Sequence, residues 1–217
     1  MSSTNRGSKR SPMDYYVTPI EPIQLFLREL NRDISWTNGD DPSLRILDPS
    51  AGGDELNPMS YPCALFDRKV TTIDIREDSP ATYKRDYLTY KTEFVHSICG
   101  GPPNIIITNP PFGLAMQFIR KALLDVAPGG LVIMLLRLNY FGSDARKEFF
   151  QSTMPSYSHV HSKRMCFWPD PISAAMLDWA TREDIKIPRK GAVDSIEYQH
   201  ATWIQGENPR HTKLRVI

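Results

Sequence analysis

The chain has 217 residues, of which 41% are hydrophobic, which suffices for one well-buried core and is short for two independent domains. Its 26 Lys and Arg residues nearly balance its 25 Asp and Glu residues, and the net charge of +1 excludes the global basic field that many nucleic-acid-binding proteins carry. Any site for a polyanion must therefore be a local patch.

The cysteines and the N-terminal residues indicate a cytoplasmic protein without a membrane partner. Cys63, Cys99 and Cys166 are scattered and form no CxxC pair, so we expect reduced, buried thiols and neither a disulfide framework nor a structural zinc. Residues 1–12 are polar and basic, which predicts a disordered tail and not a signal peptide. The longest apolar run, 131–136, is too short to span a bilayer.

The first two thirds of the chain alternate between predicted helices and predicted strands. A first helix is expected at 20–31, where Ile23, Phe26, Leu27 and Leu30 have helical spacing. Short apolar segments predict buried strands at 44–47, 70–75, 105–108 and 131–136, and a helix is predicted at 114–126. Strands of this kind, separated by helices, indicate a parallel sheet that is covered on both faces.

The pattern changes after residue 140, where alternating segments favour antiparallel strands. The predicted elements are a helix at 144–150 and strands at 160–168, 196–204 and 214–217. Residues 169–190 contain prolines and mixed charge, so we expect them to leave the sheet as an insertion. His159 and His161 form an HxH pair, but no third ligand is apparent, and we expect a surface strand and no metal.

Small and polar residues follow three predicted strands at the point where each ends. The segment 48–53 (DPSAGG) follows the first strand, Asp74 the second, and the segment 109–112 (NPPF) the third. Ligands bind beyond the carboxyl ends of parallel strands, so these residues are expected to share one site. Small residues allow close approach to the backbone, and a carboxylate accepts hydrogen bonds from ribose hydroxyls, which together predict a nucleoside site.

The spacing of this loop argues against phosphates on the nucleoside. The segment 51–56 (AGGDEL) breaks the GxGxxG fingerprint, and Asp54 would repel a phosphate. S-adenosylmethionine is a nucleoside cofactor without phosphates and fits both features. Its sulfonium favours aromatic neighbours, for which Tyr15 and Tyr16 are both candidates.

The segment 109–112 suits methyl transfer to an exocyclic amino group of a base, whose lone pair is delocalised into the ring. The Asn109 side-chain oxygen and the Pro110 carbonyl can accept the two hydrogens and localise that lone pair. Pro110 and Pro111 fix the direction of the backbone before a substrate arrives. Phe112 can stack on a base extruded from its helix, and no metal is required.

Taken in order, these segments resemble the amino-group DNA methyltransferases of the adenine-N6 kind, and more narrowly the small phage-type members of that family. The matching motifs are LDPSAGGD (47–54), TIDI (72–75) and NPPF (109–112), and further similar segments are DYYVTP (14–19), RDYLTY (85–90) and DSIEYQHATWIQG (194–206). The resemblance spans residues 14–206 and is densest over 14–112. The chain departs from the family pattern at Asp54, where a second spaced glycine is usual.

The resemblance implies an α/β, Rossmann-like methyltransferase fold with a mostly parallel seven-stranded sheet, an antiparallel C-terminal hairpin and helices on both faces. It implies a single domain over 13–217 that uses S-adenosylmethionine to methylate adenine N6 in double-stranded DNA by base flipping, with a DNA-contacting insertion at 169–190. The implied catalytic residues are Asn109, Pro110, Pro111 and Phe112, and the implied cofactor-binding residues are Tyr15, Tyr16, Thr18, Asp48, Pro49, Ser50, Gly52, Asp74 and Asp86. Asp86 would accept the adenine amino group of the cofactor.

Two alternatives stay open at the level of the sequence. Methyltransferases of RNA or of a protein glutamine share the NPPF loop, and a catalytically inactive binding module could retain the same fold. Arg137, Lys163, Arg164 and the segment 182–189 are candidates for contacts with DNA phosphates.

Overall fold

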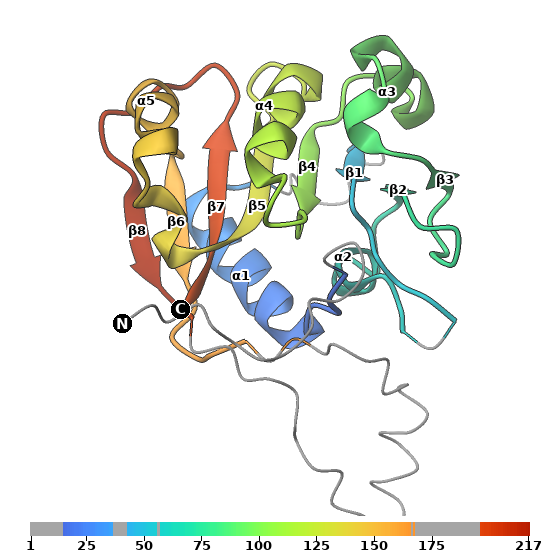
Figure 1. Cartoon of the computed structure of the whole chain (residues 1–217), viewed down its shortest axis with the longest axis horizontal. Helices are drawn as coiled ribbons and strands as arrows, with labels where there is room; N and C mark the ends of the chain where they lie inside the picture. The colour runs from blue at the N-terminus through green and yellow to red at the C-terminus, as the bar shows by residue number, and fades with distance from the viewer. Residues whose placement is uncertain (1–14, 37–42, 56, 166, 168–195) are drawn as a thin grey trace, which may run out of the picture.

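The computed structural model describes residues 15–36, 43–55, 57–165, 167 and 196–217 (Figure 1). The strands are Ile46–Asp48 (β1), Val70–Asp74 (β2), Tyr83–Lys84 (β3), Ile105–Thr108 (β4), Leu131–Arg137 (β5), Tyr157–Val160 (β6), Tyr198–Ile204 (β7) and Lys213–Val216 (β8). The helices are Ile20–Asp33 (α1), Ser60–Ala64 (α2), Thr92–Cys99 (α3), Ala115–Asp125 (α4) and Asp144–Ser152 (α5), with short 3-10 helices at Tyr87–Thr89 (η2) and Leu138–Phe141 (η3). The predicted tail (1–12), the predicted insertion (169–190) and Cys166 lie outside the described residues.

The strands form one mixed sheet in the order β3-β2-β1-β4-β5-β7-β6-β8. The pairs from β3 to β5 are parallel, whereas β7 runs antiparallel to both β5 and β6. The predicted α/β sheet with an antiparallel C-terminal hairpin is therefore confirmed. The predicted number of seven strands is wrong, since β3 adds an eighth that has only two residues and leaves no periodic pattern in the sequence.

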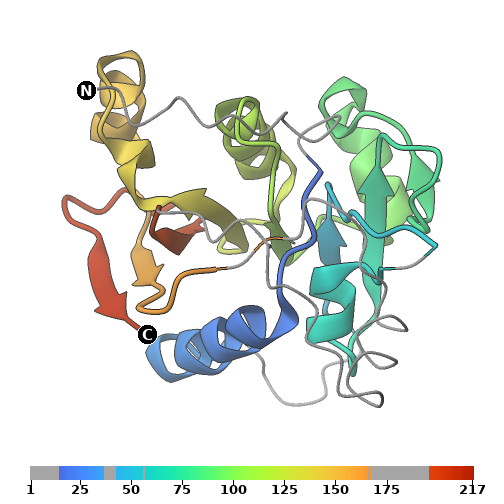
Figure 2. The same cartoon turned by 60° about the horizontal axis from the view of Figure 1, so that its bottom comes forward.

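Alternate residues of the central strands enter two separate cores, because successive side chains of a strand point to opposite faces. Ile106 and Val132 pack with α4 in one cluster, while Ile105 and Ile133 pack with α1 and α2 in the other. Figure 2 shows the sheet between these layers, with α3, α4 and α5 on one side and α1 and α2 on the other. The prediction of helices on both faces is confirmed.

The predicted strand at 160–168 is wrong, because β6 occupies Tyr157–Val160 and ends where that prediction begins. Met165 and Phe167 do bury their side chains, but they pack in a small cluster with Leu135 and Tyr198. Their hydrophobicity therefore reflects a packed loop and not a strand.

The predicted surface position of His159 and His161 is also wrong. Their exposed fractions are 0% and 4%, because α1 covers this face of the sheet and the Phe26 ring lies 5.3 Å from the His159 ring. His159 Nε2 lies 2.9 Å from Asp33 Oδ2. In the part of the chain that the structure describes, no three His, Cys, Asp or Glu side chains gather in a way that would hold a metal ion.

The predicted burial of the cysteines holds only in part. Cys63 is exposed on α2, whereas Cys99 is half-buried, and burial raises the pKa of the Cys99 thiol to about 11. Among the described helices, none is long and apolar enough to cross a membrane.

Candidate functional site

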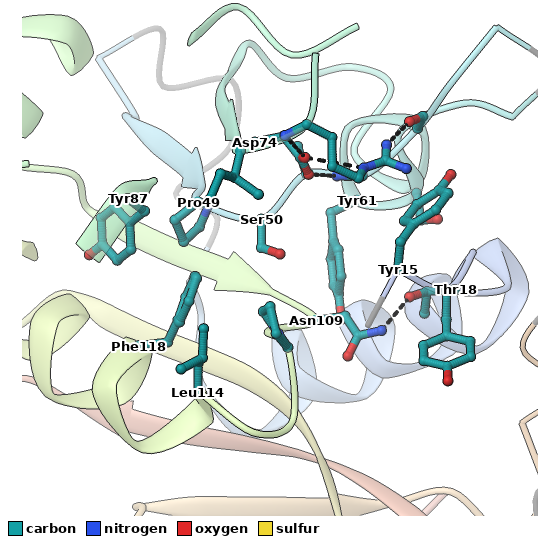
Figure 3. Close-up of a pocket in the computed structure, with 18 of the residues that line it drawn as sticks. Tyr15, Thr18, Pro49, Ser50, Tyr61, Asp74, Tyr87, Asn109, Leu114 and Phe118 are labelled. Atoms are coloured by element: carbon teal, nitrogen blue, oxygen red, sulfur yellow. Dashed lines mark hydrogen bonds and ion pairs between the residues drawn. The ribbon is translucent and has the colours of Figure 1, made fainter. Parts of the chain in front are cut away.

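A cavity of about 100 Å³ lies where β1, β2 and β4 end. Predicted site residues that line it are Tyr15, Tyr16, Thr18, Pro49, Ser50, Gly52, Asp74, Asp86, Asn109 and Pro111. Figure 3 shows Pro49, Tyr87, Leu114 and Phe118 on one side of the cavity, with Tyr15, Thr18 and Asn109 on the other. The remaining predicted residues, Asp48, Pro110 and Phe112, are not part of this wall.

The loop after β1 is held against the end of β2 by its own backbone. Gly52 and Gly53 have φ of 66° and 76°, a left-handed conformation that glycine adopts without steric cost. The Gly52 amide donates to Asp74 Oδ2 at 2.8 Å, and its carbonyl accepts from Ser79 Oγ at 2.6 Å. A Cβ atom at Gly52 would lie 3.1 Å from Tyr15 Cε2, so the loop and the N-terminal segment are in direct contact.

Asp48 joins β1 to β4 beneath this loop. Its Oδ1 accepts from Thr108 Oγ1 at 2.6 Å and from the Ser50 amide at 3.2 Å. Oδ2 has no hydrogen-bond partner among the described residues. Burial raises the pKa of Asp48 to about 7, although both hydrogen bonds favour the charged form.

Asp74 is shared between the glycine loop and an arginine that sequence reasoning missed. Asp74 Oδ1 accepts from the Arg76 amide at 2.9 Å and from Arg76 Nε at 3.3 Å. The Arg76 side chain is only 10% exposed, and its Cζ lies 3.5 Å from the centroid of the Tyr15 ring. The signal that could have found Arg76 is its place two residues after the strand-end carboxylate.

The hydroxyl end of the Tyr15 side chain is held by Asp54. The Tyr15 hydroxyl donates to Asp54 Oδ2 at 3.0 Å, and burial together with this carboxylate raises the pKa of the phenol. Asp54 Oδ1 also accepts from the Asn57 amide at 2.9 Å. Asp54 therefore makes one of the contacts that hold the N-terminal segment.

Asp86 and Tyr87 enter the cavity wall from η2. Asp86 Oδ1 accepts from the Leu88 amide at 2.9 Å, which caps the short helix. Tyr87 donates its hydroxyl to the fully buried Asp125 at 2.7 Å, and Lys121 Nζ lies 2.6 Å from the same Asp125 oxygen. This network joins η2 to α4 and fixes the position of Asp86.

Asn109 directly follows β4, with its amide oriented by Thr18. Asn109 Nδ2 donates to Thr18 Oγ1 at 2.9 Å, as the dashed line in Figure 3 shows. Asn109 Oδ1 is buried and has no hydrogen-bond partner among the described residues. An amide oxygen in this condition is an unused acceptor, because buried polar atoms are normally paired.

Phe112 lies in an aromatic cluster beside the cavity. Its ring centroid is 5.8 Å from that of Tyr198, and the Arg137 guanidinium lies 4.8 Å from the Phe112 ring centroid. Arg137 ends β5, the strand next to β4, so this predicted DNA contact lies close to the NPPF segment. Lys163 and Arg164 are exposed after β6, and 182–189 lies outside the described residues.

Tyr61 is a further wall residue that sequence reasoning missed. It comes from α2, is 2% exposed, and its hydroxyl lies 3.0 Å from His200 Nε2 on β7. No feature of the sequence around Tyr61 marks it as part of a site, because its partner is 139 residues away.

Comparison with solved structures identifies the class of fold. The chain superposes on a Listeria monocytogenes protein assigned as a class I S-adenosylmethionine-dependent methyltransferase, with a TM-score of 0.55 and 13% identity, over 93% of this chain and 65% of that one. It also superposes on the type IIG restriction endonuclease BpuSI, with a TM-score of 0.56 and 11% identity, over 97% of this chain and 27% of that one. The chain thus has the Rossmann-like fold of methyltransferases and spans less than two thirds of either neighbour. Comparisons with protein-family models and with curated proteins gave no match.

Proposed function

We propose that the protein is an S-adenosylmethionine-dependent methyltransferase that modifies N6 of adenine in DNA. The observation that carries the proposal is the amide of Asn109, a residue that lines the cavity: its nitrogen is held by Thr18, and its buried oxygen has no hydrogen-bond partner among the described residues. An oriented, unused acceptor next to a nucleoside pocket is what an amino-group substrate requires.

The residues around the cavity fit the cofactor by their chemistry. Asp74 and Asp86 offer carboxylates at the ends of the wall, and Ile75, Leu114 and Phe118 give apolar surface for a base. When bound, S-adenosylmethionine supplies an electrophilic methyl group on a sulfonium.

The chain's own residues would orient the substrate amino group. Asn109 Oδ1 would accept one hydrogen and the Pro110 carbonyl the other, which turns the nitrogen lone pair out of the base plane. Pro110 is buried, and Pro111 accepts from the Leu114 amide at 2.8 Å, so the turn that carries these acceptors is anchored to the start of α4. Preorganisation of this kind lowers the barrier because no loop has to be ordered during the reaction.

Two observations favour DNA as the substrate. One structural neighbour is a restriction endonuclease, and Arg137 places a cation beside Phe112, where phosphate contacts and base stacking are both possible. Phe112 would stack on the extruded adenine, and the exposed Lys163 and Arg164 would contact the backbone of the duplex.

Methyl-labelled S-adenosylmethionine, offered with unmethylated genomic DNA, with rRNA and with a peptide release factor, tests the proposal. We expect label in N6-methyladenine of the DNA. Label only in RNA or only in protein glutamine would assign the protein to one of the two alternatives. Absence of cofactor binding by calorimetry would leave an inactive module of the same fold.

A further inference from the structure

The N-terminal segment is tied to the candidate cofactor site by two side chains that the NPPF chemistry does not use. Asp54 accepts from the Tyr15 hydroxyl at 3.0 Å, and the Arg76 guanidinium covers the Tyr15 ring at 3.5 Å. The Tyr15 ring in turn lies against Gly52, where even a single added carbon would come within 3.1 Å of it. We infer that Asp54 and Arg76 form a clamp on Tyr15, and that this clamp positions Tyr15 as the cover of the cofactor pocket.

Arg76 is suited to this role because it contacts three separate parts of the site at once. Its Nε lies 3.3 Å from Asp74 at the end of β2, one terminal nitrogen donates to the Gly53 carbonyl, and its Cζ lies over the Tyr15 ring. A guanidinium is planar and has five donors, so it can bridge a carboxylate, a carbonyl and a ring together, which an ammonium cannot. Nearly complete burial keeps these contacts from being screened by solvent.

Asp54 is suited to its role because its own loop holds it in place. Asp54 donates its amide to the Asn57 carbonyl at 2.9 Å and accepts from the Asn57 amide at the same distance. The Asn57 side chain also donates to both Asp54 oxygens, at 3.0 and 3.1 Å. The carboxylate is therefore fixed before it meets the Tyr15 hydroxyl.

The clamp also reaches the predicted catalytic amide through a short stretch of backbone. Thr18, three residues after Tyr15, accepts from Asn109 Nδ2 and is 3% exposed. A displaced Tyr15 would therefore pull on the residue that orients Asn109. The clamp couples closure of the cofactor pocket to alignment of the amino-group acceptor.

The inference rests on the proposed function in one respect, that the pocket binds S-adenosylmethionine. Calorimetry with S-adenosylhomocysteine measures the affinity of the pocket without any methyl acceptor and so tests the clamp. Y15F keeps the ring under Arg76 and removes the donor to Asp54, so we expect about tenfold weaker binding. R76M keeps the length of the side chain without its charge or donors, and we expect a loss of at least about tenfold. In the double variant Y15F/R76M the loss of affinity should be smaller than the product of the two single losses, because both changes weaken the hold on the same residue, Tyr15.

Arg45 provides a matched control. Like Arg76, it donates to a backbone carbonyl, in this case from its Nε to Pro102 at 2.8 Å, and it packs on a glycine, Gly101. It precedes β1, however, and so lies at the opposite end of the sheet. R45M should therefore bind S-adenosylhomocysteine within about twofold of the wild-type protein, even where its thermal stability falls as much as that of R76M.

The possible outcomes separate the clamp from the proposed function. A wild-type protein that does not bind S-adenosylhomocysteine contradicts the proposed function itself. If the wild-type protein binds and the affinities of Y15F and R76M for S-adenosylhomocysteine lie within twofold of it, the clamp alone is overturned. Tighter binding by R76M also overturns the clamp, because Arg76 would then obstruct the pocket. If R76M fails to fold, Y15F still tests the clamp, because it removes only one hydroxyl group and should leave the fold intact.

Discussion

A chain of hydrogen bonds leads from the candidate cofactor pocket into the buried C-terminal half of the sheet. The Tyr61 hydroxyl lies 3.0 Å from His200 Nε2, and His200 Nδ1 lies 2.8 Å from His161 Nε2. His200 is fully buried and stacks on Phe26 with ring centroids 4.0 Å apart. Only one proton can lie between the two imidazoles, so the chain is satisfied when both rings are neutral and is broken when both become cations.

Acidification should therefore destabilise the folded protein. Burial lowers the pKa of His161 to about 4 and that of His200 well below its usual value, with the neighbouring histidines adding to both effects. An unfolded histidine has a pKa of about 6.5, so above that pH neither state binds the proton, and below it the unfolded state binds more. At about 1.4 kcal/mol per pH unit, His161 alone lowers the free energy of unfolding by about 2 kcal/mol at pH 5 and by about 3 kcal/mol at pH 4.

Asp48 acts in the opposite direction over part of this range. Burial raises the pKa of Asp48 to about 7, whereas an unfolded aspartate has a pKa near 3.9, so folded Asp48 takes up a proton that the unfolded chain does not. Its contribution to stability is present at low pH and is lost as the pH rises towards 7. The pH dependence of the wild-type protein alone consequently does not isolate the histidines.

The comparison of wild-type protein with H161Q removes this interference, since Asp48 is common to both. Glutamine keeps a donor and an acceptor but does not titrate. Urea unfolding, followed by the fluorescence of the buried Trp203, should give a free-energy advantage of wild type over H161Q that shrinks by about 2 kcal/mol from pH 7.5 to pH 5. The exposed His211 provides the control, and H211Q should follow the wild-type curve. An advantage that stays constant over this range would refute the argument.

Three further changes test the candidate site itself. N109A should lower turnover on DNA by at least about a hundredfold and leave the affinity for S-adenosylhomocysteine within about twofold, and a variant that keeps most of its rate would contradict the assigned role. T18V removes the acceptor that orients the Asn109 amide, so kcat should fall about tenfold, while T18S should restore it. G52A places a methyl group against Tyr15 at φ of 66° and should weaken binding of S-adenosylhomocysteine about tenfold; G129A, at φ of 72° with open space around it, should bind like wild type.

The parallel half of the sheet could be predicted from the sequence because its strands are continuous apolar runs. Ile105–Thr108 was predicted with the bounds that the structure has, and β1, β2 and β5 differ from their predicted bounds by one or two residues. Parallel strands that pair side by side bring their carboxyl ends to one edge, which is why Asp74 and Asn109 meet at one cavity although 35 positions separate them along the chain. Topology thus converts a local pattern into a predicted site.

The C-terminal half of the chain was harder to predict, because the burial of its side chains depends on contacts with elements outside their own strands. His159 and His161 alternate with Val160, a pattern that predicts a strand with one solvent-exposed face. In the structure α1 covers that face, and both rings are buried. Two further misses lie in the parallel half of the sheet and beside it. β3 has two residues, and Tyr61 lies in a five-residue helix, so neither element is long enough for a periodic pattern to show. Burial by a distant helix and short elements are the two reasons why sequence reasoning failed here.

Asp54 shows how a departure from a motif can be compensated by a partner far along the chain. The left-handed φ values of the loop fall on the adjacent Gly52 and Gly53, both of which precede Asp54. The carboxylate is then free to bind Asn57 within its own loop and Tyr15, which is 39 positions earlier. A spaced glycine could make neither bond. Asp54 therefore holds the loop by a fixed contact with the N-terminal segment, and we expect the candidate cofactor pocket to depend on Tyr15 to a corresponding degree.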